Sequence, residues 1–321
     1  MIDFSRALSL AWERMVIILF SPFDLGKWFA IGLSAFLAGF LSGGNGINSS
    51  YNYNNKFNSF SGGAQSPSAS IHQLYSSLSG AMAGVQLAII IIVGFVVLLF
   101  VLALIVVIYW LGARGQFLFL DNIVRNRGAI AWPWSYYSRQ ANSLFLFYLL
   151  LIVVSLLIFL PIIGVAIMMG IPLYIHQRWP EGWEIVGFIV LGLAYMVIAT
   201  VFSFILFVFK EFGVPLMFRN GLLAQTAFME SLSIIRLHFG SVFVYVLLRI
   251  ALWLAIVILS IITCCFTCCI AMLPYIGTVV LLPALVFVRC FSLDCLAQFG
   301  PQYDVWTVDV PPEPTPGAAS S

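Results

Sequence analysis

The sequence predicts an all-α, polytopic membrane protein with six transmembrane helices. They are expected as three αα hairpins, with interfacial helices on the cytoplasmic side. Three observations predict this class. Hydrophobic residues make up 62% of the 321-residue chain and charged residues only 8%, whereas a soluble domain carries about 25% charged residues. Long apolar runs alternate with polar segments, and lysine and arginine gather in every second connection between those runs.

The N-terminal residues 3–20 predict a helix that lies on the membrane rather than through it. Its apolar face includes Phe4 and Ala11 and its polar face includes Arg6, a division that suits the membrane interface. Pro22 is expected to end this helix, because proline lacks an amide donor and restricts the residue before it.

Residues 25–41 form the first candidate span. With about 17 residues against the roughly 20 that a crossing needs, a re-entrant helix is the alternative. Ala35 and Gly39 belong to a series of small residues at every fourth position, which lets helix backbones approach closely in lipid. Residues 42–84 are rich in Ser, Asn and Gly, with Lys56 as their one formal charge, and predict a mobile polar loop outside the cytoplasm.

Five further apolar runs complete the six spans of a helical transmembrane domain over residues 1–298. They lie at 85–111, 144–169 and 185–209, and in a hairpin over 241–296 that turns at 273–277. Residues 299–321 contain five prolines and no hydrophobic period, so they predict a disordered C-terminal tail.

The distribution of cations predicts the orientation. One set of alternate connections carries ten cations: Arg6, Arg14, Lys27, Arg114, Arg125, Arg127, Arg139, Lys210, Arg219 and Arg236. The other set carries Lys56 and Arg178. Positively charged loops stay in the cytoplasm. We therefore expect a multi-pass protein of the inner (plasma) membrane with both termini in the cytoplasm.

Short matches suggest three copies of one unit, made of a surface helix, an outward span and a returning span. Leu120-Asp121 after the second span matches Leu293-Asp294 at the end of the sixth. Arg125-Asn126 matches Arg219-Asn220 at equivalent connections. The surface helices of the three units are expected near Asp3, Trp132 and Leu222.

Three segments carry a resemblance to a known group of proteins. They are Phe23-Asp24-Leu25-Gly26-Lys27-Trp28-Phe29, Val214-Pro215-Leu216-Met217 and residues 227–240. The chain resembles uncharacterised multi-pass bacterial membrane proteins, similar in layout to the membrane domain attached to some glycerophosphodiester phosphodiesterases. Those enzymes carry metal-binding acids and histidines in a separate soluble domain. This sequence shows no such domain, so the resemblance implies a membrane fold without that activity.

Two arginines inside apolar runs are the candidate binding residues. Arg249 lies in the fifth span and Arg289 in the sixth, at similar depth from the cytoplasmic side. Ionisable residues within spans usually have a function or a partner. Asp294 is the expected partner, with Glu211 and Glu230 as further plausible carboxylates. Either a structural ion pair or lipid-phosphate contact, or a substrate site, fits this pattern.

Four cysteines, Cys264, Cys265, Cys268 and Cys269, end the fifth span. One helix cannot surround a metal with four ligands, and cysteine also packs as a small hydrophobe. We expect packing, with a soft-metal site as the weaker alternative, and we expect no cofactor. No phosphate loop, metalloprotease helix or nucleophile elbow occurs in the sequence.

The sequence therefore predicts a non-enzymatic membrane protein. The leading hypothesis is a scaffold, a lipid-organising element or a subunit of a membrane assembly. The alternative is a small transporter or permease that uses Arg249, Arg289 and Asp294. Expected partners are the bilayer, anionic lipids of the inner leaflet and a membrane protein. Nucleic acid is not expected, because the basic segments abut spans.

Overall fold

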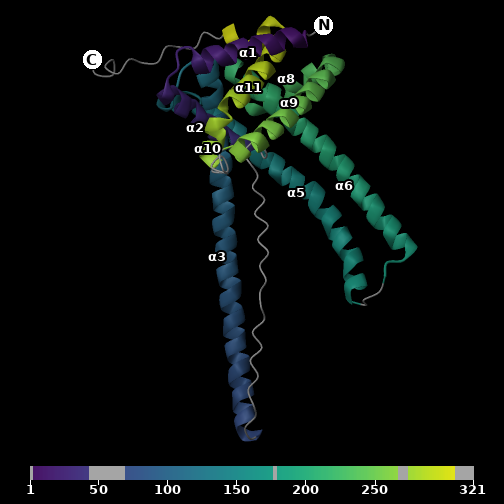
Figure 1. Cartoon of the computed structure of the whole chain (residues 1–321). Coiled ribbons are helices and arrows are strands. Elements are labelled where there is room, and N and C mark those ends of the chain that lie inside the picture. The colour runs from purple at the N-terminus through teal and green to yellow at the C-terminus, as the bar shows by residue number, and fades with distance from the viewer. Residues whose placement is uncertain (1–2, 43–68, 176–178, 267–273, 308–321) are drawn as a thin grey trace. The chain divides into compact units, whose positions relative to one another are not determined.

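The computed structural model describes residues 3–42, 69–175, 179–266 and 274–307, and within those ranges every regular element is helical. The all-α prediction is confirmed for this part of the chain. The elements are α1 (Phe4–Phe20), α2 (Leu25–Ser42), α3 (Ala69–Val124), α4 (Ala131–Tyr136), α5 (Ser138–Ile175), α6 (Gly182–Val208), η1 (Phe209–Gly213), α7 (Val214–Asn220), α8 (Ala224–Leu237), α9 (Phe239–Phe266), α10 (Pro274–Val280), α11 (Leu282–Ala297), η3 (Pro301–Tyr303) and η4 (Val305–Thr307) (Figure 1). Residues 48–108 form one compact unit and the remainder forms another.

Helix α3 is much longer than the sequence predicts. It begins at Ala69, inside the expected polar loop 42–84, and ends at Val124, well beyond the expected span 85–111. No proline occurs between its ends, so every residue within it keeps an amide donor and nothing forces a break. Residues 43–68 lie outside the described residues.

Among the described residues, four helices are long and apolar enough to cross a membrane: Ile89–Val124, Ser138–Leu173, Gly182–Asn220 and Phe239–Thr263. Their surfaces expose large apolar side chains, among them Phe100 at 68%, Leu157 at 71% and Met168 at 75%. Apolar surface on this scale needs lipid around it. The chain is therefore a helical membrane protein.

The first and last predicted spans are less regular. Helix α2 has 18 residues, and the last apolar run is divided at Leu281 into α10 and α11. Pro283 lies in the first turn of α11, where its missing amide hydrogen costs nothing. The 16 residues of α11 rise about 24 Å, less than the roughly 30 Å hydrocarbon core. The six-span hairpin layout therefore stays a prediction.

A single π-helical turn, η1, joins α6 to α7. The amide of Val214 donates to the carbonyl of Phe209, five residues back. Pro215 follows at once. It has no hydrogen to donate to the Glu211 carbonyl, and its ring would clash with that group in a regular α-helix. The wider turn relieves this clash, and π turns of this kind are frequent at functional sites.

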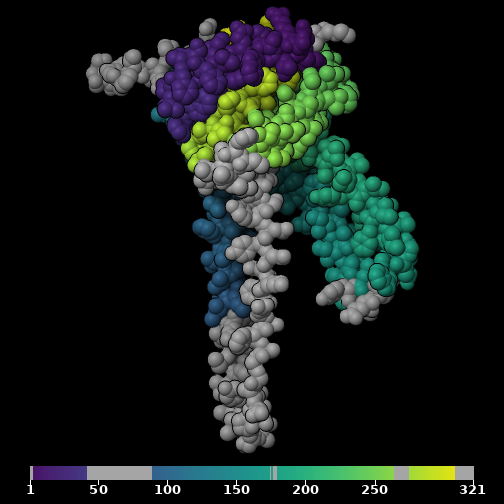
Figure 2. Space-filling view, in the orientation of Figure 1, coloured from purple at the N-terminus to yellow at the C-terminus, as the bar shows by residue number. Residues whose placement is uncertain are grey.

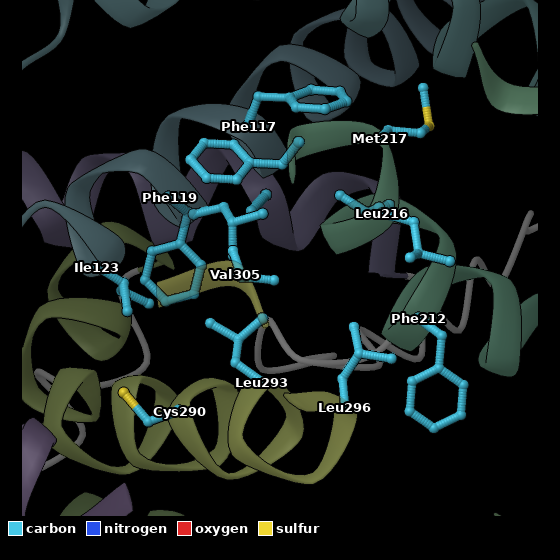
Figure 3. Packing of buried hydrophobic residues seen from close by; sticks show 14 of the residues in the cluster. Phe117, Phe119, Ile123, Phe212, Leu216, Met217, Cys290, Leu293, Leu296 and Val305 are labelled. Carbon is cyan, nitrogen blue, oxygen red and sulfur yellow. The ribbon is translucent and has the colours of Figure 1, made fainter. Parts of the chain in front are cut away.

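The core forms where α3, η1–α7 and α11 converge (Figure 3). Each segment contributes fully or almost fully buried apolar side chains, including Phe117, Phe119 and Ile123, then Phe212, Leu216 and Met217, then Cys290, Leu293 and Leu296. Val305 lies between these segments and is 0% exposed. Each of these segments lies at the end of the predicted returning span in one of the three sequence repeats.

The C-terminal segment differs from the predicted disordered tail 299–321. Its first part forms the short turns η3 and η4. Val305 is buried in the core, and the ring of Trp306 lies 3.7 Å beneath the guanidinium of Arg14. Burial of Val305, this cation–π contact and a hydrogen bond from Arg219 to the hydroxyl of Thr307 hold the segment against the rest of the unit. Residues 308–321 lie outside the described residues.

Helices α1, α4 and α8 lie at the three positions where the sequence predicts surface helices. Helix α1 begins after Asp3, whose carboxylate accepts from the amide of Arg6. It packs along α11 through Ala7, Ala11 and Met15. Figure 2 shows α1, α11 and α9 side by side on one face of their unit. These residues belong to the predicted apolar face, and this part of the face meets a neighbouring helix.

Helices α2 and α3 approach closely. A Cβ on Gly115 would lie 2.5 Å from the amide nitrogen of Ala38 and from Cβ of Leu37. Ala35, from the predicted small-residue series, is buried, and so is Ala38. The close approach depends on the glycine of α3 as much as on the small residues of α2.

Candidate functional site

The two candidate arginines meet at one carboxylate. Arg249 comes from α9 and Arg289 from α11, and both lie beside Glu211 in the π turn η1. Arg249 Nη2 lies 3.1 Å from Oε1 of Glu211, and Arg289 Nη1 lies 3.9 Å from Oε2. The three side chains are only 11%, 8% and 3% exposed. The arrangement is a buried triad with two cations and one anion.

Two hydroxyl groups complete the surroundings of the carboxylate. Ser292 Oγ donates to Oε2 of Glu211 over 2.7 Å. The hydroxyl of Tyr245 lies 3.1 Å from the same oxygen and 3.0 Å from Ser292 Oγ. Both oxygens of Glu211 therefore have charged or hydroxyl partners, which compensate for the burial of the carboxylate.

Asp294 lies in a different cluster from the two arginines. Its Oδ1 is 3.3 Å from Nε of Arg14 in α1. Arg289 and Asp294 are five positions apart on one helix, so they point about 140° apart around its axis at 100° per residue. The shared carboxylate is Glu211, one of the further candidates from the sequence, and Asp294 instead pairs α11 with α1.

A small cavity of about 60 Å³ adjoins the triad. Its lining includes Lys210, Glu211, Arg249 and Arg289, with small residues of α2 on the other side. Nε of Arg249, and Nε and Nη2 of Arg289, are buried with no hydrogen-bond partner among the described residues. Three cations and one carboxylate border this space, so its lining carries a surplus of positive charge.

Equivalent positions of the three returning segments contribute to this cavity. Gln116 precedes Asp121 by five positions, as Arg289 precedes Asp294. Gln116 also precedes Arg125 by nine positions, as Lys210 precedes Arg219. Gln116, Lys210 and Arg289 all line the cavity. The sequence prediction assigned Lys210 to a cytoplasmic connection and did not consider Gln116. Aligning the three repeats at their Leu-Asp and Arg-Asn motifs would have found both residues.

A larger groove opens on the other side of Lys210. It has a volume of about 420 Å³ and lies between α5 and α6, beside Tyr109 of α3 and Leu41 of α2. Lys210 lines both the groove and the cavity. Tyr148 also lines the groove, and its hydroxyl is buried without a hydrogen-bond partner among the described residues.

A second buried carboxylate, Asp121 at the end of α3, is fully paired. Arg127 Nη2 lies 2.8 Å from Oδ2 and Arg125 Nε 3.3 Å from Oδ1, and both guanidinium groups stack on Trp132. The hydroxyl of Tyr137 is 3.3 Å from Oδ1. Burial, and then the charge of Asp121, raise the pKa of Tyr137 well above its ordinary value, so it stays a neutral donor. These contacts stabilise the turn between α3 and α4.

Asp3 has a structural role at the N-terminus of α1. At the start of α1, the amide of Arg6 and the hydroxyl of Ser5 donate to Asp3 and lower the pKa of its carboxyl.

Of the four candidate cysteines, Cys264 and Cys265 lie in the last turn of α9, whereas Cys268 and Cys269 lie outside the described residues. Within the described ranges, no group of three or more His, Cys, Asp or Glu could hold a metal ion.

Comparisons with known proteins give one match. The model of a family of unknown function, DUF7544, matches residues 3–298. No curated protein matches, and no solved structure matches. The likeness to the membrane domain of glycerophosphodiester phosphodiesterases therefore receives no support.

Proposed function

Since the chain belongs to the DUF7544 family of unknown function, we propose its role from the geometry of the cavity. The protein is a non-catalytic, multi-pass membrane protein that binds an anionic group between Lys210, Arg249 and Arg289. It acts as a lipid-organising element or scaffold of the inner membrane, alone or as a subunit of a membrane assembly.

The observation behind this proposal is the uncompensated positive charge around a buried space. Glu211 balances one of the three cations that line the cavity. Two guanidinium groups have N–H donors for which the described part of the chain supplies no partner. A buried charge or donor without a partner is costly. An anion with several oxygens, such as a phosphate, would accept these donors and balance the charge.

Anion binding is tested with the purified protein in detergent at constant ionic strength. Replacing chloride by inorganic phosphate at about ten times its Kd is expected to raise Tm by about 2–4 °C. Lys210→Met should abolish this shift, because it removes a cation from the cavity. Arg236→Met, which removes an exposed cation of α8, should preserve it. An equal shift in both variants would refute the proposed site.

Transport is the second candidate, and one feature favours it. Lys210 borders both the cavity and the larger groove between α5 and α6, so an ion bound at Lys210 could pass from one space to the other. Asp294, paired with Arg14, is not part of that route. Uptake of labelled phosphate into reconstituted vesicles, lost in Lys210→Met, would identify a transporter. Binding without uptake would identify the lipid-organising role.

The proposed topology has six spans with both termini in the cytoplasm. It is supported by the sequence, in which ten cations fall in one set of predicted connections, against Lys56 and Arg178 in the other. In intact cells, a membrane-impermeant thiol reagent should label Lys56→Cys. It should label Arg236→Cys only after permeabilisation, with the wild-type signal subtracted as background. The reverse pattern would exclude this orientation.

A further inference from the structure

We propose that the bound anion is the phosphate of an anionic phospholipid, whose acyl chain lies in the groove between α5 and α6. This inference rests on the proposed anion site and names its ligand. It follows from the position of Lys210, which lines both the charged cavity and the groove.

The groove has the character of an acyl-chain site. Most of its lining is apolar: Leu41, Leu151, Ile152, Phe202, Leu206 and Phe207. Its volume of about 420 Å³ falls within the range of about 300–1,000 Å³ that is typical of small-molecule sites. Helices α5 and α6 are both among the four membrane-spanning candidates, so lipid surrounds this surface of the protein.

Polar groups gather at the end of the groove that Lys210 borders. Tyr148 is only 7% exposed, and its hydroxyl has no hydrogen-bond partner among the described residues. Arg249 and Arg289 also line the cavity, and buried N–H groups of both lack a hydrogen-bond partner among the described residues. A lipid supplies acceptors for both: ester oxygens for the tyrosine hydroxyl, and phosphate oxygens for the cations.

The charge of the cavity selects among lipids. A phosphatidylglycerol headgroup carries one net negative charge and reduces the surplus of two positive charges around the cavity. A phosphatidylcholine headgroup carries the same phosphate together with a quaternary ammonium, which the neighbouring cations repel. The site therefore favours anionic over zwitterionic lipids.

The test compares three probes by native mass spectrometry of the detergent-purified protein. The probes are phosphatidylglycerol, phosphatidylcholine with the same chains, and glycerol 3-phosphate, which has no chains. Phosphatidylglycerol should bind at least about tenfold more tightly than phosphatidylcholine, and Lys210→Met should remove about that factor, as expected for one charge-assisted hydrogen bond.

A substitution in the groove separates the chain from the headgroup. Ser203→Trp places a large ring among the groove residues of α6. It should weaken phosphatidylglycerol binding about tenfold while leaving glycerol 3-phosphate binding unchanged. Val197→Trp, at a lipid-exposed position of the same helix, is the matched control and should change neither.

The outcomes distinguish the two proposals. If glycerol 3-phosphate binds, and phosphatidylglycerol binds no more tightly or is unaffected by Ser203→Trp, the anion site stands and the lipid inference fails. If neither probe binds in a manner that depends on Lys210, the anion site itself fails, and the lipid inference fails with it.

Discussion

Glu211→Gln is expected to lower the free energy of unfolding in detergent by about 3–5 kcal/mol, because it leaves two buried arginines without their shared anion. The amide keeps the size of the side chain and can still form a hydrogen bond with Ser292. The decrease in the free energy of unfolding therefore measures the effect of removing the charge, not of changing the volume. Thermal or denaturant unfolding of the purified protein measures the effect. Glu13→Gln, on the exposed face of α1, should change the stability by no more than about 0.5 kcal/mol.

The same variant also tests the anion site. Without Glu211 the cavity is bordered by three cations and no carboxylate, so added phosphate or anionic lipid should stabilise Glu211→Gln more than the wild type. Asp294→Asn provides the contrast. Its partner Arg14 is 31% exposed and also stacks on Trp306. The decrease in stability of Asp294→Asn should therefore be smaller than that of Glu211→Gln, and added phosphate should not change it. Equal losses in the two variants would show that Glu211 has no special role.

Gly115→Ala is expected to destabilise the protein by about 2–3 kcal/mol through overpacking. The added methyl would lie 2.5 Å from the amide nitrogen of Ala38, 2.5 Å from Cβ of Leu37 and 2.6 Å from the Leu37 carbonyl carbon. Two of these atoms are backbone, so no side-chain rotation removes the clash, and α2 must move away from α3. Since α2 also lines the cavity, anion binding should weaken as well.

Gly94→Ala is the matched control for this substitution. Gly94 lies in the same helix, α3, and an added Cβ there meets nothing within 4 Å. Alanine favours the helix by about 1 kcal/mol over glycine, so this variant should be neutral or slightly more stable. If Gly115→Ala behaves in the same way, the close packing of α2 on α3 is not required for the fold.

The sequence indicated much of the candidate site but not its central group. Charged residues are so rare in this chain that Arg249 and Arg289 stand out in their apolar runs. Their partner could not be selected from Asp294, Glu211 and Glu230 by sequence alone. Helical spacing shows which residues share a face of one helix, but not which faces of two distant helices meet. The π turn at Phe209–Gly213 further shifts the helical phase at Glu211.

Composition and the long apolar runs determined that this chain is an α-helical membrane protein. So few charged residues cannot cover a water-facing globule, and apolar runs of about 20 residues or more cross lipid as helices, whose backbone is hydrogen-bonded internally. Tertiary structure alone decided what fills the interior. It placed Glu211 between two arginines, Lys210 between cavity and groove, and Val305 in the core among three matched helix ends. These positions depend on contacts between segments far apart in the chain, and such contacts leave no periodic trace in the sequence.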